Sequence, residues 1–291
     1  MENTKQKTSE IIYKYNLKAV KKLGQNFLID DEVLDNIVQM SDVTSDDLVI
    51  EIGPGLGNLT EYILAQTDYV LAIEYDKKMI QILQDRFISK KYFEVINNDI
   101  LKINLDEEIQ KYRSKYDNIK INRVLVIANL PYYITTPILF NLFESNFNIS
   151  SLTLMMQKEV ANRIIASTNN SKEYGILSIM ANYYSKPNVL FDVYPKSFIP
   201  SPGVISSVVK FDICKRYNVK NQKIFIELVK KAFAQRRKKL LNSLYSNKFM
   251  NMSKENLIDL FKKCSIDENT RAEQLGIEKY VEIVDKLSQS L

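Results

Sequence analysis

Short apolar runs alternate with amphipathic segments through the first two thirds of the chain. Helical spacing of apolar residues predicts helices at about 32–40, from 58, and at 76–87, 136–144, 158–167 and 175–184. Val, Ile and Leu dominate the runs, which are short enough for buried strands: 48–52, 69–73, 92–96, 124–127, 152–156, 189–193 and 206–213. The alternation predicts an α/β fold built on an open, largely parallel sheet.

The pattern changes near residue 214, beyond which the spacing is helical throughout. We therefore expect two domains, residues 1–213 and a small helical domain at 214–291. Residues 1–20 read as a short helical or loose extension of the first domain. The division separates the sheet-forming part of the chain from a part that forms helices alone.

Positive charge is concentrated in the expected helical domain. Residues 215–248 hold 11 Lys or Arg residues and one acid, a charge of +10, so the rest of the chain sums to −5 within the total of +5. The densest point is Arg236, Arg237, Lys238 and Lys239. Such a block favours a surface that faces a polyanion. A solvated, lysine-rich helix face is the alternative.

Three of the seven glycines of the chain lie in one turn, at Gly53, Gly55 and Gly57, directly after the run 48–52. A strand, a glycine turn and a helix bring backbone N–H groups up to a ligand. A dinucleotide fingerprint would place its third glycine at position 58, which is Asn58. The spacing therefore favours a nucleoside ligand without a pyrophosphate, and a turn required only for packing is the alternative.

Polar side chains follow three of the expected strands at the point where each strand ends. Glu74 ends the second strand, Asp99 follows the third, and Asn129 follows the run 124–127. The carboxyl ends of parallel strands meet at one edge of the sheet, where ligands bind. An acid after the second strand is suited to the two hydroxyls of a ribose. Taken singly, each acid is more commonly a helix cap or a solvated loop residue.

The sequence Asn129-Leu130-Pro131-Tyr132 has the groups needed to hold a planar amine. Pro131 disfavours helical geometry at Leu130, so the Leu130 carbonyl can leave the ladder. The Asn129 side chain adds a second acceptor, and Tyr132 adds a flat ring. These groups suit the amino group of adenine, whose lone pair becomes available once both N–H groups are held. A proline turn with packed tyrosines is the alternative interpretation.

The composition limits the kinds of catalytic and metal site that the chain can form. The chain has no histidine, which excludes histidine triads and histidine-based acid–base catalysis. Cys214 and Cys264 are isolated, so neither a disulfide framework nor a zinc site is predicted. No apolar run of 18 residues is present, and the N-terminus resembles neither a signal nor a transit peptide, so we expect a cytoplasmic protein without a membrane partner.

With these motifs assembled, the chain resembles the ribosomal RNA adenine dimethyltransferases of the small-subunit type, the family of the kasugamycin-resistance methyltransferase. The resemblance extends over nearly the whole chain, and a Pro-rich run at 195–202 that presents Phe198 belongs to it. It is carried by residues 23–28 (LGQNFL), 51–57 (EIGPGLG), Glu74, Asp99, 129–132 (NLPY), 198–206 and 271–275 (RAEQL).

The resemblance implies a doubly wound sheet with an antiparallel last strand, a helical C-terminal domain that binds RNA, and S-adenosylmethionine as the methyl donor. Dimethylation would occur at two adjacent adenosines in a hairpin near the 3′ end of small-subunit rRNA. The expected partners are this rRNA and the assembling small ribosomal subunit, bound by a monomer. By resemblance the cofactor site comprises Asn26, Leu28, Gly53, Gly55, Glu74, Asp99 and Asn129, and the adenine site comprises Asn129, Leu130, Pro131, Tyr132 and Phe198.

Two other functions share these motifs. One is the related methyltransferase that acts on large-subunit rRNA and confers antibiotic resistance, and the other is a non-catalytic nucleic-acid-binding factor on the same fold. The motif at 23–27 and the loop of Phe198 resemble the small-subunit group more closely. In that group Tyr132 and Phe198 would sandwich an extruded adenine, so the Tyr132 ring is expected to matter more than its hydroxyl.

Overall fold

The structure is a computed structural model, in which the contacts within the chain define two compact units. The first comprises residues 1–161 and 188–213, and the second comprises 162–187 and 214–291. The described residues are 3–17, 25–144, 148–168, 172–214 and 216–289, so Leu23, Gly24 and Lys215 lie outside them. The boundary expected after residue 213 coincides with one junction between the two units. Residues 162–187, which the sequence analysis assigned to the sheet domain, are grouped by their contacts with the second unit.

A seven-stranded sheet organises the first unit, in the order β4-β3-β2-β5-β6-β9-β7. The first five strands of this order pair in parallel, and β9 pairs antiparallel with β6. The strands are β2 (Asp47–Ile52), β3 (Val70–Glu74), β4 (Phe93–Asn97), β5 (Arg123–Asn129), β6 (Ser151–Gln157), β7 (Ser185–Val193) and β9 (Ser206–Ile213). The predicted α/β class and the antiparallel last strand are confirmed.

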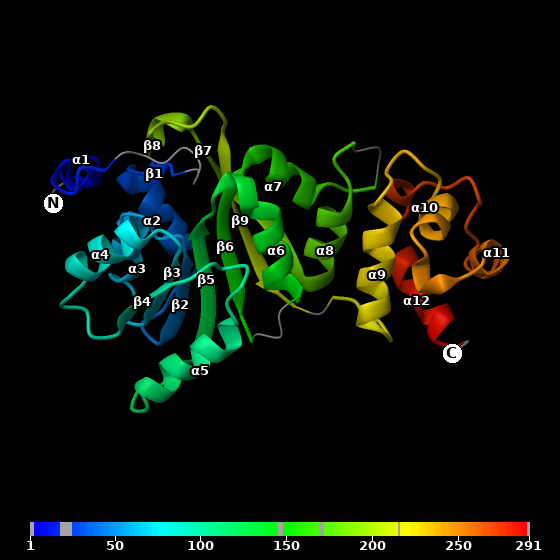
Figure 1. Ribbon diagram of the computed structural model, residues 1–291, viewed down its shortest axis with the longest axis horizontal. Helices are drawn as coiled ribbons and strands as arrows, with labels where there is room; N and C mark the ends of the chain where they lie inside the picture. The colour runs from blue at the N-terminus through cyan, green and yellow to red at the C-terminus, as the bar shows by residue number, and fades with distance from the viewer. Residues whose placement is uncertain (1–2, 18–24, 145–147, 169–171, 215, 290–291) are drawn as a thin grey trace. The chain divides into compact units, whose positions relative to one another are not determined.

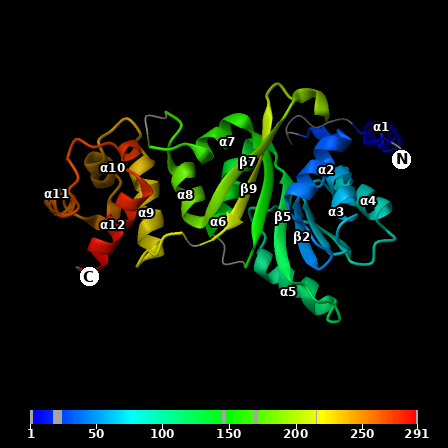
Figure 2. The same ribbon diagram turned by 180° about the vertical axis from the view of Figure 1, so that it is seen from behind.

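Helices cover both faces of this sheet. In Figure 1, α6 lies in front of it, and in Figure 2 α2 lies in front. The helices that connect the strands are α2 (Asp31–Met40), α3 (Asn58–Ile63), α4 (Lys77–Arg86), α5 (Leu105–Lys115), α6 (Thr135–Glu144) and α7 (Lys158–Ile165), and an N-terminal helix α1 (Thr4–Lys14) precedes them. The strand order reverses between β2 and β5, which is the topological switch point where a doubly wound sheet opens a crevice.

A second, two-stranded sheet joins distant parts of the first unit. In it β1 (Phe27–Leu28) pairs antiparallel with β8 (Phe198–Ile199), so Leu28 lies opposite Phe198. Both side chains are buried in the core that packs against the seven-stranded sheet. Short 3₁₀ turns at Tyr132–Ile134 and Pro195–Ser197 lead into α6 and β8.

Helices make up most of the second unit. Phe225, Phe249, Phe261 and Tyr280 form part of its buried interior. The Tyr280 hydroxyl donates to the Ala272 carbonyl at 2.8 Å, which satisfies its buried polar group. The helices are α8 (Ile176–Tyr184), α9 (Gln222–Phe233), α10 (Leu240–Ser246), α11 (Lys254–Lys263) and α12 (Ile277–Ser288), with 3₁₀ turns at Phe249–Asn251 and Ala272–Gln274.

Candidate active site

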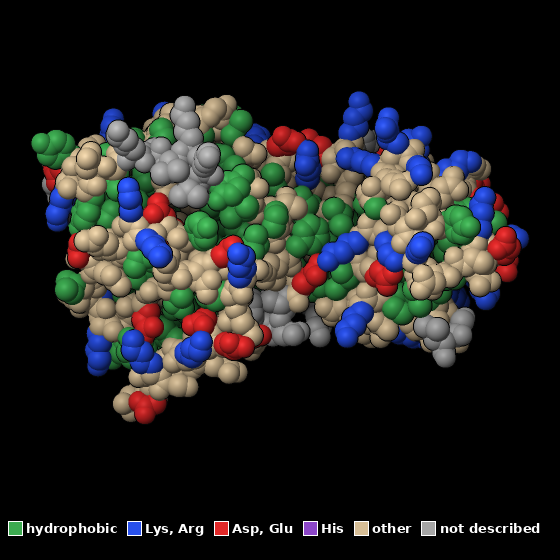
Figure 3. All heavy atoms as spheres, in the orientation of Figure 1, with side chains coloured by type: hydrophobic (Ala, Val, Ile, Leu, Met, Phe, Trp, Pro, Cys, Tyr) green, Lys and Arg blue, Asp and Glu red, His purple; other side chains and the backbone are tan. Residues whose placement is uncertain are grey.

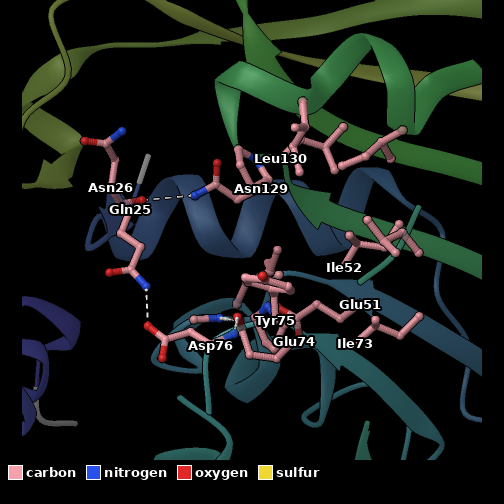
Figure 4. A pocket seen from close by; sticks show the side chains of 18 of the residues that line it. Gln25, Asn26, Glu51, Ile52, Ile73, Glu74, Tyr75, Asp76, Asn129 and Leu130 are labelled. Carbon is pink, nitrogen blue, oxygen red and sulfur yellow. Dashed lines mark hydrogen bonds between the residues drawn. The ribbon is translucent and has the colours of Figure 1, made fainter. Parts of the chain in front are cut away.

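A pocket of about 430 Å³ opens at the carboxyl ends of the parallel strands, at the switch point (Figure 4). Glu74 and Tyr75 line it from the end of β3, and Asn129 and Leu130 line it from the end of β5. Ten of the predicted site residues line this pocket: Asn26, Leu28, Gly53, Gly55, Glu74, Asp99, Asn129, Leu130, Pro131 and Tyr132. Loops distant in the sequence thus converge on one cavity.

The glycine turn between β2 and α3 requires glycine for its backbone. Gly53, Gly55 and Gly57 have φ angles of +67°, +57° and +82°, in the region that disfavours other residues. A Cβ atom on Gly57 would lie 2.7 Å from the Phe87 ring, whereas one on Gly53 would meet no atom within 4 Å. Gly53 and Gly55 line the pocket. The turn therefore brings backbone close to any ligand, and Gly57 lets it pack onto α4.

Glu74 is a buried carboxylate held by the glycine turn. Its side chain is 8% exposed, its Oε2 accepts a hydrogen bond from the Gly55 N–H at 3.1 Å, and its Oε1 accepts from the Asp76 N–H at 2.8 Å. Burial raises the pKa of Glu74, and the two backbone hydrogen bonds oppose that rise. Each carboxylate oxygen can accept a second hydrogen bond, so Glu74 can also bind ligand hydroxyls.

Glu51 is a second acid of the pocket, and the sequence analysis did not select it as a site residue. It is 1% exposed, and its Oε2 accepts from the Thr60 hydroxyl at 2.6 Å. Burial raises its pKa to about 8. Glu51 is therefore protonated at neutral pH. Its position inside a strand-forming run gave no signal that could be distinguished from an ordinary strand residue.

Asn129 is fixed by the wall of the pocket opposite its strand. Its Nδ2 donates to the Asn26 carbonyl at 3.2 Å (Figure 4), which leaves Oδ1 as an acceptor. The Leu130 N–H donates to the Met155 carbonyl at 3.1 Å, and Pro131 then takes an extended conformation. Asn129, Leu130 and Pro131 line the pocket together, as the sequence analysis expected.

Tyr132 is anchored through its hydroxyl, which sequence reasoning did not foresee. The phenol oxygen lies 2.6 Å from Ser206 Oγ, and Ser206, the first residue of β9, is fully buried. Burial raises the pKa of Tyr132, so the phenol is neutral at physiological pH. Tyr132 lines the pocket, and the hydrogen bond between its hydroxyl and Ser206 fixes the orientation of its ring.

Phe198 lies apart from the pocket. It is 3% exposed, pairs with Leu28 across the two-stranded sheet, and packs in the core with Leu34 and Val193. It is not among the residues that line the cavity. The structure therefore does not bring Phe198 and Tyr132 together as two faces of one base site, because strand pairing draws the Phe198 ring into the core.

The basic cluster of the second unit lies in the turn between α9 and α10. All four predicted residues are exposed, and Lys and Arg side chains are numerous over this unit in Figure 3. Arg236 donates to Glu273 Oε2 at 3.0 Å and to the Tyr174 carbonyl at 3.1 Å, and Lys239 donates to Asn269. Arg237 and Lys238 have no side-chain partner among the described residues. Arg236 and Lys239 thus bond to other parts of the described chain, whereas the exposed side chains of Arg237 and Lys238 do not.

Within the described ranges, no group of three Cys, Asp or Glu residues could hold a metal ion. Over the same part of the chain, no helix is both long and apolar enough to cross a bilayer.

The sheet order and the pocket at the switch point define a Rossmann-like protein with a candidate ligand site at the carboxyl ends of its parallel strands. A family model described as ribosomal RNA adenine dimethylase matches residues 16–289. The chain belongs to this family, and it is a methyltransferase of the rRNA adenine dimethyltransferase type. The family inferred from the motifs is confirmed.

Relatives and solved structures agree with this assignment. The ribosomal RNA small subunit methyltransferase A of Alkaliphilus oremlandii is 45% identical over 287 residues, covering 98% of this chain and 97% of the relative. The protein of the same name from Clostridium botulinum is 43% identical over 280 residues, covering 96% and 97%.

Two crystal structures share the fold. The dimethyladenosine transferase of Plasmodium falciparum has a TM-score of 0.72 and 24% identity, covering 90% of this chain and 98% of that one. The 23S rRNA methyltransferase ErmE has a TM-score of 0.64 and 19% identity, covering 91% and 100%. At these identities the two structures support the fold alone.

Proposed function

We propose that the chain uses S-adenosylmethionine to dimethylate the amino nitrogens of two adjacent adenosines in a hairpin near the 3′ end of small-subunit rRNA. The observation that carries this proposal is the convergence of Glu74, the glycine turn and the sequence 129–132 on one pocket. The small-subunit substrate is favoured over the large-subunit one because relatives at 41–45% identity are named small subunit methyltransferases. The proposal includes action by a monomer in the cytoplasm, on naked or assembling subunit rRNA.

The residues of the pocket fit the proposed cofactor. A volume of about 430 Å³ suits a nucleoside with a short charged tail. Glu74, buried and with acceptor capacity left, would hold the ribose hydroxyls, and Asp99 would accept from the adenine amino group. Gly53 and Gly55 would allow close approach of the tail, and Asn26 and Leu28 would close the opposite wall. When bound, S-adenosylmethionine supplies an electrophilic methyl group.

The chain's contribution to the reaction would be positioning and electrostatics. In the first transfer, Asn129 Oδ1 and the Leu130 carbonyl would each accept one N–H of the target amine. This would favour a pyramidal nitrogen whose lone pair can form the new N–C bond while the bond between the methyl group and the donor's sulfur breaks. The nitrogen then carries positive charge, and one of its protons becomes acidic and is lost to water. No strong base is needed, which agrees with a chain that has no histidine.

Tyr132 would hold the target base outside its stack. Extruding a base costs a few kcal/mol, and stacking on an aromatic ring returns about 1–3 kcal/mol. With Phe198 in the core, this stacking rests on Tyr132 in the present conformation. A second stacking face from Phe198 would require the loop at 195–204 to rearrange. Arg237 and Lys238 would contact phosphates elsewhere on the RNA.

The proposal is tested by Asn129→Ala, with Asn122→Ala as the matched control. Asn122 lies directly before the first residue of β5, at the other end of the strand from Asn129, and it is exposed. Asn129→Ala removes one acceptor for the amine, so methyl transfer should fall about 10²–10³-fold, the loss seen when a transition-state hydrogen bond is removed. The control should be unaffected. Tritium transfer to rRNA from a strain lacking the gene measures the rate.

Measurements of stability, cofactor affinity and the site of modification complete the test. Thermal unfolding should show that both variants remain folded, and calorimetry should show that cofactor affinity changes far less than turnover. Primer extension on both rRNAs should find the wild-type modification in small-subunit rRNA. Near-normal transfer by Asn129→Ala would refute its role, and modification confined to large-subunit rRNA would refute the proposed substrate.

A further inference from the structure

The N-terminal helix α1 carries two buried threonines in its first two turns, which are otherwise polar. Thr4 is 5% exposed and Thr8 is 0% exposed, although α1 has exposed lysines along its other side. A threonine hydroxyl buried to this degree is expected to have a hydrogen-bond partner. None of the sequence motifs lies in α1, so its buried threonines are not accounted for by the predicted site.

Hydrophobic contacts attach α1 to the pocket wall. Ile11, Ile12 and Tyr15 pack against a buried cluster that contains Phe27 and Leu56. Phe27 and Leu56 both line the pocket. One side of α1 therefore packs on a cluster that also forms part of the pocket wall.

A hydrogen-bonded chain runs from α1 to the same wall. Asn58 Nδ2 donates to Thr8 Oγ1 at 2.8 Å and to the Leu28 carbonyl at 2.8 Å. Asn58 is the first residue of α3, directly after the glycine turn, and it is nearly fully buried. Asn58 and Leu28 line the pocket, whereas Thr8 does not. Thr8 is thus connected to the pocket wall by its hydrogen bond with Asn58.

Ion pairs hold α1 in this place. Lys7 Nζ lies 2.7 Å from Glu61 Oε1 on α3, and the other oxygen of Glu61 lies 2.8 Å from the Arg86 guanidinium on α4. Arg86 also donates to the Leu56 carbonyl of the glycine turn. The docked helix, α3, α4 and the glycine turn therefore form one connected structure around the pocket.

We propose that α1 is a positioning element for the cofactor, and that Thr8 is its key residue. Thr8 accepts one N–H of Asn58 while the Leu28 carbonyl accepts the other. Thr8 thereby orients the Asn58 side chain, which joins the Leu28 strand to the helix after the glycine turn, the two walls that the proposed function assigns to S-adenosylmethionine. The inference rests on that proposed function. It assigns to α1 an effect on cofactor affinity, and no effect on the transfer step once the cofactor is bound.

Reciprocity follows from this arrangement. If docking of α1 strengthens cofactor binding, cofactor binding must strengthen docking of α1 by the same factor. Backbone amides in the last turns of α1 should therefore exchange more slowly with deuterium when S-adenosylmethionine is present. A helix that only covers an apolar surface remote from the ligand would show no such change.

The test compares Thr8→Val with Thr8→Ser and with Ser9→Ala. Valine keeps the shape of threonine and removes the acceptor, so one buried N–H of Asn58 loses its partner. Serine keeps the hydroxyl. Ser9 is the exposed neighbour, and its Oγ donates only to the Lys5 carbonyl of its own helix at 3.0 Å, which makes Ser9→Ala a matched control.

Thr8→Val should raise the Kd and the KM for S-adenosylmethionine about tenfold, equivalent to about 1.4 kcal/mol. The kcat at saturating cofactor and the KM for RNA should stay at wild-type values. Thr8→Ser and Ser9→Ala should match the wild type in all four quantities. Calorimetry measures the Kd, tritium transfer measures the kinetic constants, and hydrogen exchange with and without cofactor measures docking.

The outcomes separate this inference from the proposed function. A wild-type protein that does not bind S-adenosylmethionine would overturn both. Wild-type binding with unchanged affinity in Thr8→Val would overturn the inference alone, even if the melting temperature fell. If Thr8→Val is too unstable to assay, the exchange experiment on the wild type decides, because α1 amides that are insensitive to cofactor would overturn the inference.

Discussion

The hydrogen bond between Tyr132 and Ser206 permits a quantitative test of how the base-binding ring is held. Tyr132→Phe removes only the phenol oxygen, which lies 2.6 Å from Ser206 Oγ. The sequence alone suggested that the ring would matter more than the hydroxyl. The structure predicts instead that both matter, because the hydroxyl fixes the orientation of the ring.

The magnitudes follow from burial. Ser206 is fully buried, so Tyr132→Phe leaves a buried hydroxyl without its partner, at a cost of about 1–3 kcal/mol in the free energy of unfolding. Ser206→Ala should cost less, about 0.5–1.5 kcal/mol, because Tyr132 is only partly buried and the group left without a partner is less completely removed from water. In the double variant no unpartnered hydroxyl remains, so the two losses should not add.

The same set of variants reports on catalysis. A loosely held ring should lower kcat/KM by up to about tenfold in Tyr132→Phe, which corresponds to about 1.4 kcal/mol. Tyr132→Ala should lower it further, because the stacking surface itself is lost. Urea unfolding and methyl transfer are measured on all four variants. Strictly additive losses in the double variant would refute the shared hydrogen bond, and equal activity of Tyr132→Phe and Tyr132→Ala would refute the stacking role of the ring.

Two further predictions concern Glu51 and the basic turn. Burial raises the pKa of Glu51 from its usual 4.5 to about 8, so the folded protein keeps a proton that the unfolded chain releases. Relative to Glu51→Gln, the stability of the wild type should therefore fall by about 1.4 kcal/mol per pH unit between about pH 4.5 and 8 and level off above, and parallel unfolding curves would contradict this. Replacing Arg237 and Lys238 by Gln should weaken RNA binding and reduce the slope of log K against log salt by about 2, without loss of stability, whereas an unchanged slope would show that they do not contact phosphate. Arg236→Gln, the comparison variant, should instead lower the melting temperature, because its partners are within the protein.

The sheet and its ligand-binding edge could be predicted because their signals are local. In the seven-stranded sheet, apolar runs predicted the strand bounds to within one or two residues except at the start of β7, and glycine and strand-end residues marked the pocket. The parts that could not be predicted depend on contacts between distant segments. The pairing of Leu28 with Phe198 uses two residues per strand, which leaves no periodic signal. The helix α5 was not predicted, although its buried positions have helical spacing.

The same distinction applies to side chains. Thr8 reads as an ordinary polar helix residue until its partner Asn58 is known, 50 positions away. Ser206 is likewise one of two adjacent serines, and only the structure shows that it meets Tyr132. Charge counting predicted a basic surface, but it could not separate Arg236, which is held by Glu273, from the cations that face solvent.

The long spacing between paired segments has a consequence for synthesis of the chain. Leu28 in one wall of the pocket pairs with Phe198, 170 positions later, which is synthesised roughly 9–34 s after it at about 5–20 residues per second. Once β6 has been made and until β9 follows, β6 has no β9 beside it, and its apolar side chains border an open strand edge. The nascent chain therefore passes through a stage in which the five parallel strands exist without β9, and in that stage the open edge of β6 can pair with another chain.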